Sequence, residues 1–205
     1  MVRSLADELM HAEVGAFLAA TDEVMNSNTL LLKFHLDAGS ATMDCPKMLW
    51  AMLRSPVFGE AMLEADRNRD WHNFIDLTTG QRRQREGAIG GFWLVDEGCE
   101  LVCVNLDLSQ LRARFLGMLC DSFSPFGRRR TSQQADGLVS TFIRRLLAPS
   151  PDEWCLHSVE PNFLWSTGYY ADRLDFGYFD GGNNDSATLM HRQDIAFLLL
   201  TNGSP

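Results

Sequence analysis

The chain has 205 residues, of which 45% are hydrophobic and 22% are charged, a composition typical of a folded globular protein with one well-buried core. Its formal net charge of −9 argues against an unaided nucleic-acid-binding protein, because contacts to phosphate groups require a basic surface. No apolar run approaches the ~18 residues that a membrane span needs, and the N-terminal residues lack the apolar segment of a secretory signal. We therefore expect a cytoplasmic protein that binds neither nucleic acid nor a membrane.

The first third of the chain predicts two helical segments separated by a strand. Apolar residues recur with helical spacing over 4–25, and the run TLLLKFHL at 29–36 predicts a strand. Pro46 fits the first turn of a second helix. Ser55-Pro56 should break or kink that helix before it resumes over 58–63.

Residues 89–120 are the most informative stretch for the fold. Two apolar runs at 92–95 and 101–104 flank a turn that contains Gly, which predicts a β-hairpin. Asp107 or Ser109 then caps a predicted helix. Its apolar residues follow helical spacing, and we expect them to be buried: Leu111, Phe115, Met118 and Leu119. A strand pair that leads into an amphipathic helix indicates one layer of an α+β core.

The remaining segments predict loops, one more helix and a second run of strands. Residues 64–91 have few periodic apolar positions and predict surface loops with a short strand near 73–77. A polar connector at 122–134, the one candidate sub-boundary, precedes a helix over 138–147. Strands are predicted at 153–159, 174–179, 187–190 and 195–201. We therefore predict a single α+β domain over 1–205, with a mainly antiparallel sheet and helices packed against one face.

The cysteine pattern predicts free thiols. The chain has an odd number of cysteines, and most of them lie in apolar segments: Cys45, Cys99, Cys103, Cys120 and Cys155. Cys99 and Cys103 would share one strand face, but their separation of roughly 13 Å along a strand rules out a simple disulfide between them. We expect five free thiols in a reducing compartment.

Cys155 and His157 are the candidate catalytic residues. They lie two residues apart in EWCLHS and would share one face of a predicted strand. A nucleophilic thiol needs an imidazole close in space, although the same two side chains are alternatively metal ligands. The chain has no second pair with CxxC or HxxxH spacing, and its other histidines are scattered: His11, His35, His72 and His191. We therefore predict no metal site and no cofactor.

The segment around Trp71 is the candidate binding surface. Trp71 stands among charged residues in the least regular segment, and an exposed tryptophan surrounded by charge is typical of an interface anchor. Asp66, Asp70 and Asp76 add negative charge to the same segment. An acidic surface favours a basic partner through electrostatic steering, so we expect a basic protein partner.

Two main functions follow from these patterns. The first is a small acidic protein-binding module, such as an inhibitor, an immunity-type protein or an accessory factor, that docks on a basic protein. The alternative is a hydrolase-type enzyme with a site built from dispersed residues, either Cys155 with His157 or the set of Asp70, His72 and Asp76. A structural or oligomer-forming subunit is a third alternative, because the C-terminal strands could present a sheet edge to another chain.

Overall fold

The structure is a computed structural model. It describes residues 2–3, 11–39, 43–68, 100–122, 124–161, 163, 178–179, 182 and 184–202. The helices among these residues are α2 (Ala12–Met25), α3 (Cys45–Leu53), α4 (Pro56–Asn68), α5 (Leu108–Cys120) and α6 (Ser132–Leu147). The strands are β1 (Val2–Arg3), β2 (Leu30–His35), β3 (Cys103–Leu106), β4 (Cys155–Val159), β5 (Ser186–His191) and β6 (Ile195–Thr201). A 3₁₀ turn at Pro151–Glu153 precedes β4.

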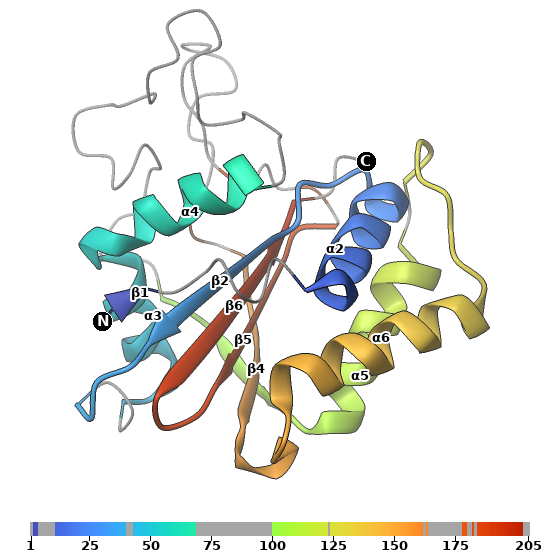
Figure 1. Cartoon of the computed structure of the whole chain (residues 1–205). Helices are drawn as coiled ribbons and strands as arrows, with labels where there is room; N and C mark the ends of the chain where they lie inside the picture. Colours follow the sequence, from blue (N-terminus) through green and yellow to red (C-terminus); the bar gives the residue numbers. More distant parts are fainter. Residues whose placement is uncertain are drawn as a thin grey trace, which may run out of the picture.

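The strands form one antiparallel sheet in the order β1-β2-β6-β5-β4-β3, as Figure 1 shows for its central part. Strand β2 from the N-terminal part of the chain pairs with β6 from the C-terminal part. The β5–β6 hairpin is closed by a short turn in which the Arg192 amide donates to the Ile195 carbonyl. The architecture confirms the predicted α+β class and the antiparallel sheet, and it is consistent with a single domain.

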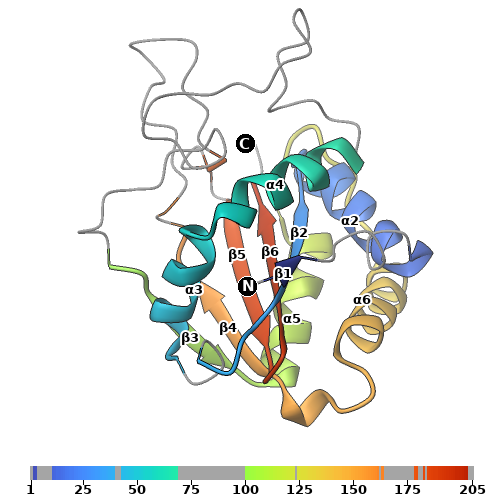
Figure 2. The same ribbon diagram turned by 60° about the vertical axis from the view of Figure 1, so that its left-hand side comes forward.

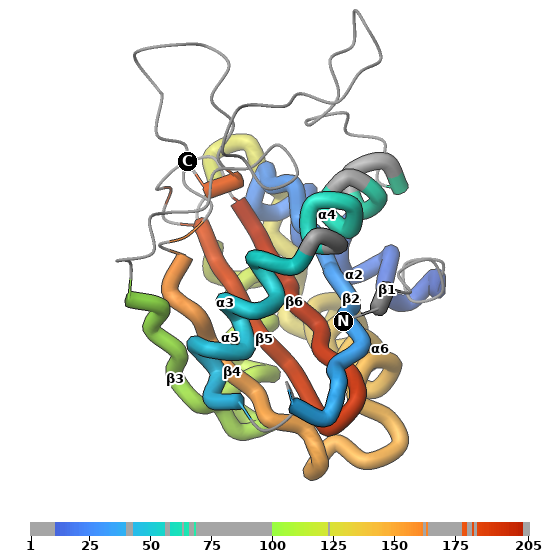
Figure 3. The backbone as a smooth tube through the Cα atoms, turned by 90° about the vertical axis from the view of Figure 1, so that its left-hand side faces the viewer, coloured from blue at the N-terminus to red at the C-terminus, as the bar shows by residue number. Residues whose placement is uncertain are grey.

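Helices lie on both faces of the sheet, whereas the sequence prediction placed them on one. Figures 2 and 3 show α3 and α4 on one face and α2, α5 and α6 on the other. The buried apolar side chains form two clusters, one beneath each group of helices. Every residue of the central strands β5 and β6 is buried, because helices cover both sides of those strands.

The ends of the predicted helices are set by local chemistry. Helix α5 begins at the N-cap Asp107, where the Asp107 carboxylate and the Gln110 side chain form a reciprocal capping box. Helix α2 ends at Asn26, whose φ of 49° is the left-handed conformation that closes many helices. Helix α4 begins at Pro56, so the predicted break at Ser55-Pro56 is confirmed. The predicted burial of the apolar face of α5 is also confirmed: Leu111, Phe115, Met118 and Leu119.

Two expectations about the segment before α5 have different outcomes. Strand β3 covers Cys103–Leu106 and pairs with β4. The predicted hairpin partner at 92–95 lies outside the described residues, so that pairing stays a prediction.

The prediction of five free thiols is wrong, because Cys45 and Cys103 form a disulfide. The disulfide joins the first residue of α3 to the first residue of β3, with 6.3 Å between the two Cα atoms. That distance lies within the range that disulfide geometry requires. The partners are separated by 58 positions in the sequence, so only the packing of α3 beside β3 brings them together. Cys120 and Cys155 are free.

Candidate functional site

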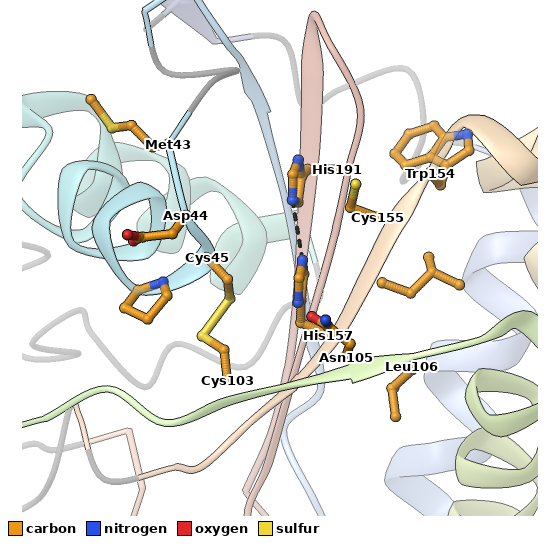
Figure 4. Close-up of a pocket in the computed structure, with 12 residues that line it drawn as sticks. Met43, Asp44, Cys45, Cys103, Asn105, Leu106, Trp154, Cys155, His157 and His191 are labelled. Carbon is orange, nitrogen blue, oxygen red and sulfur yellow. Dashed lines mark hydrogen bonds between the residues drawn. A yellow bond between two sulfur atoms is a disulfide. The ribbon is translucent and has the colours of Figure 1, made fainter.

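A cavity of about 500 Å³ opens between the start of α3 and the part of the sheet where β4 begins and β5 ends (Figure 4). Strands β3, β4 and β5 supply one wall, and the first turn of α3 with the residue before its N-cap supplies another. Its polar and titratable lining consists of Asp44, Asn105, Cys155, His157 and His191. The disulfide between Cys45 and Cys103 also lines the cavity.

Strand register places the two histidines of this cavity side by side. Cys155 on β4 stands opposite His191 on β5, and His157 stands opposite Leu189. His157 and His191 are therefore diagonal neighbours on the same face of the sheet. Their Nε2 atoms are 3.2 Å apart, and the two ring planes are nearly parallel, at 6°. Figure 4 shows the rings pointing at one another.

Both imidazoles are buried, with 9% of His157 and 7% of His191 exposed. Burial lowers the pKa of His157. It also lowers the pKa of His191, to about 4, with a smaller contribution from the positive charge of His157. Both rings are therefore neutral near pH 7. In a neutral pair only one Nε2 can donate, and the buried Nδ1 of His157 has no hydrogen-bond partner among the described residues.

The free thiol of Cys155 lies beside this pair. Cys155 is exposed, stands directly opposite His191 and precedes His157 by two residues on the same strand face. No hydrogen bond joins its sulfur to either imidazole in the part of the chain that the structure describes. Neutral imidazoles do not supply the positive charge that stabilises a thiolate. The geometry thus places Cys155 next to the pair without the ion pair that a cysteine nucleophile uses.

The spacing of the two Nε2 atoms also fits a shared metal ion. Two nitrogens that each lie ~2.0–2.1 Å from a tetrahedral zinc ion are separated by ~3.3 Å. Within the described residues no three His, Cys, Asp or Glu side chains are already grouped around one point. Cys155 is the residue best placed to complete such a set, because directly opposed residues in an antiparallel pair have Cβ atoms ~4.5–5.5 Å apart.

Asp44 and Asn105 stand at other edges of the cavity. A hydrogen bond from the Lys47 side chain, 2.7 Å long, is the largest cause that lowers the pKa of Asp44. This pairing leaves Asp44 engaged away from the imidazoles. Asn105 is exposed on β3 directly opposite His157, and Figure 4 shows its amide beside that ring. Acceptors such as its carbonyl oxygen orient a histidine whose Nε2 binds a metal, because they accept a hydrogen bond from the Nδ1 hydrogen of that ring.

The predicted site residues have different outcomes. The structure brings Cys155 and His157 into one cavity and adds His191, which the sequence pattern does not group with them. His191 directly follows the predicted strand at 187–190, and only the register of that strand with the one at 153–159 places it opposite Cys155. Asp70, Trp71, His72 and Asp76 lie outside the described residues, and Asp66 lies on α4 with no described side chain.

Comparisons of the chain with protein-family models, with curated proteins and with solved structures find no match. Among the described residues, no helix is both long and apolar enough to cross a membrane. The basis for a functional proposal is therefore the cavity and its side chains.

Proposed function

We propose that the chain is a metal-dependent hydrolase in which His157, His191 and Cys155 hold a zinc-class ion. The observation that carries the proposal is the approach of two buried, neutral imidazoles to 3.2 Å through their Nε2 atoms, at the wall of an open cavity. A hydrogen bond alone would explain the distance. It would not explain why two polar rings are buried together at the wall of an open cavity.

The protonation states favour metal binding. A histidine must be neutral to coordinate, and the lowered pKa values of both rings mean that no proton has to leave them near pH 7. The Cys155 thiol loses its proton to solvent when the sulfur coordinates. Three protein ligands are the number found at catalytic zinc sites, where a fourth position remains for water.

The cavity supplies the remaining requirements of hydrolysis. A zinc ion held by three protein ligands lowers the pKa of a bound water to ~7 and polarises a carbonyl or phosphoryl oxygen. Apolar lining from Met43, Leu106 and Trp154 would hold the body of a small substrate. Asn105 stands opposite His157 on β3, and with a metal bound its amide oxygen would be the acceptor for the Nδ1 hydrogen of that ring. We therefore propose a small substrate with an apolar part and one hydrolysable carbonyl or phosphoryl bond.

Cobalt titration tests the ligand set directly. The metal-free protein should bind one Co²⁺ per chain, with the visible absorption of a tetrahedral site and a thiolate-to-cobalt charge-transfer band. His157→Leu and His191→Leu should each lower the affinity at least ~10-fold. Cys155→Ser should remove the charge-transfer band. His35→Leu, at a histidine on β2 away from the cavity, is the matched control and should bind as the wild type does.

Activity measurements then separate this proposal from a thiol-based hydrolase. With a small panel of chromogenic esters and phosphoesters, hydrolysis should require added Zn²⁺ and should be lost in His191→Leu. Hydrolysis that survives chelation but stops after alkylation of Cys155 would instead support Cys155 as the nucleophile. Absence of Co²⁺ binding by the wild type would contradict the metal proposal.

An acidic protein-binding module is the second candidate, and it is favoured by the net charge of −9. Its proposed contact residues are Asp66, Asp70, Trp71 and Asp76. A basic protein partner remains part of that proposal. The two functions are compatible, because the cavity and this segment involve different residues.

A further inference from the structure

Arg114 is a partly buried arginine on α5 that reaches the first residues of β5. Its Nε donates to the Thr188 hydroxyl at 3.1 Å, and one Nη2 hydrogen is directed at the Ser186 hydroxyl at 2.5 Å. Nη2 also donates to the Ala187 carbonyl at 3.3 Å. Thr188 and Ser186 are themselves buried, at 0% and 8% exposure. These contacts hold the guanidinium in one orientation against the sheet.

No carboxylate in the described part of the chain forms an ion pair with Arg114. Its three acceptors are two hydroxyls and one carbonyl, all of them neutral. Two other arginines provide the contrast: Arg112, on the same helix, pairs with Asp136, and Arg130 pairs with Glu23. Partial burial lowers the pKa of Arg114. None of the three contacts neutralises the guanidinium, so its charge is available to an external anion.

Arg114 has donors left over and lines a small cavity. A guanidinium has five N–H groups, and three of them are used in the contacts above, which leaves the two on Nη1. Arg114 lines a cavity of about 200 Å³ between α2, α5 and the start of β5. Its polar lining also includes Ser122, Asn184, Asp185 and Ser186. Hydroxyl and amide donors beside a guanidinium are the groups that recognise phosphate and carboxylate oxygens.

We propose that this cavity binds a small oxyanion that carries a hydroxyl donor beside its charge, such as a phosphate group, with Arg114 Nη1 as the main contact. Asp185 lines the same cavity, so it disfavours a fully ionised ligand and can accept a hydrogen bond from an acidic P–OH. Phosphate retains such a hydroxyl near pH 7, whereas sulfate does not. The volume of about 200 Å³ suits one phosphate group.

This site is separate from the histidine cavity. Ser186, Thr188 and Met190 occupy every second position of β5 and therefore share one face of the sheet. Met190 belongs to the core cluster beneath α2, α5 and α6, so this is the face that those helices cover. His191 lines the cavity on the opposite face, five residues and ~17 Å further along the strand. Binding at Arg114 therefore does not depend on the metal proposal.

Thermal unfolding of the full chain with inorganic phosphate tests the inference. In chelating buffer, phosphate should raise the Tm of the wild type in a saturable manner, and equimolar sulfate should raise it less. Arg114→Met should abolish the phosphate response. In anion-poor buffer the Tm of this variant is the reference for its own phosphate response, because the substitution removes both a charge and three hydrogen bonds. Arg112→Met, on the same helix, is the matched control and should keep the full response to phosphate.

Two outcomes would overturn the proposal. One is a wild type that does not respond to phosphate at millimolar concentration, and the other is an equal response in Arg114→Met and the wild type. Ser122→Ala provides an independent test if Arg114→Met does not fold, since it removes one lining hydroxyl from the cavity without changing charge. It should weaken phosphate binding several-fold, and unchanged binding in Ser122→Ala under those conditions would count against the site.

Discussion

Acid should destabilise the fold through the histidine pair, and His191 is the residue on which to test this. In the folded chain its pKa falls from 6.5 to about 4, first because the ring is buried and second because of the charge on His157. The unfolded chain takes up a proton near pH 6.5, whereas the folded chain resists protonation until the pH approaches 4. The stability contributed by the neutral ring is therefore complete above pH 6.5 and is lost as the pH falls toward 4. Since one pKa unit corresponds to ~1.4 kcal/mol, the total loss is about 3 kcal/mol.

Urea denaturation of the wild type and of His191→Leu, from about pH 8 to about pH 4.5 in chelating buffer, measures this loss. Over this pH range the free energy of unfolding of the wild type should fall further than that of the variant, by most of these ~3 kcal/mol. Carboxylates that titrate in both chains cancel in this difference. Cys155→Ser is the control, since it changes the same cavity without removing an imidazole. Identical pH dependence in the wild type and His191→Leu would refute the inference that His191 is buried in its neutral form.

Three further predictions concern the disulfide, the core and the proposed partner. Cleavage of the Cys45–Cys103 disulfide, whose partners are 58 positions apart, should lower the free energy of unfolding by about 4 kcal/mol in the chain-entropy model. Denaturation with and without a dithiol reductant measures this effect, and Cys45→Ser should not respond to reduction. Phe115→Ala should cost on the order of 3–5 kcal/mol in denaturant unfolding, because the ring is fully buried, whereas the exposed Phe126→Ala should cost less than ~0.5 kcal/mol. If the chain binds a basic partner, affinity measured at rising salt should fall with screening, and salt-independent binding would count against steering by the acidic surface.

Local features of the fold could be predicted from the sequence because they depend on neighbouring residues. The helical spacing of Leu111, Phe115 and Met118 predicted the buried face of α5. Asp107, one of the two predicted caps, marks its start through a hydrogen bond that spans only three residues. Strand β6 at Ile195–Thr201 matches the predicted range for the same reason, since a run of apolar residues favours a strand locally.

An unbroken apolar run in the sequence indicates that helices cover both faces of the sheet, but the prediction did not use it. Residues 196–200 read AFLLL without alternation, and a strand exposed on one face would alternate apolar and polar residues. The structure buries all of β6, with Leu198 and Leu200 in one core cluster and Phe197 and Leu199 in the other. An uninterrupted apolar strand thus indicates helices on both sides of a sheet.

The candidate site could be predicted only in part, because it depends on pairing between distant segments. Cys155 and His157 share a face through the local alternation of a strand. His191 joins them through the register of β4 with β5, which brings together residues 34 positions apart. The Cys45–Cys103 disulfide depends in the same way on where α3 packs. The position of His191 and the disulfide both depend on how distant segments pair and pack, which periodicity within a single segment does not specify.

Two buried imidazoles stabilise a fold less than apolar side chains of similar volume would, and this difference provides a last test of the role of the histidine pair. Val159 on β4 and Leu189 on β5 place fully buried aliphatic side chains on the same face, next to His157. The two rings, by contrast, bury polar atoms, including an Nδ1 that lacks a partner among the described residues. Replacing both members of a buried polar pair by apolar groups of similar volume is often neutral or stabilising. The double variant His157→Leu/His191→Leu should therefore be as stable as the metal-free wild type or more stable, by up to ~2 kcal/mol, while Co²⁺ binding is lost. Denaturant midpoints near pH 7.5 provide the measurement. A clearly destabilised double variant would mean that the pair holds the sheet together, and the argument that a bound ligand explains its burial would no longer stand.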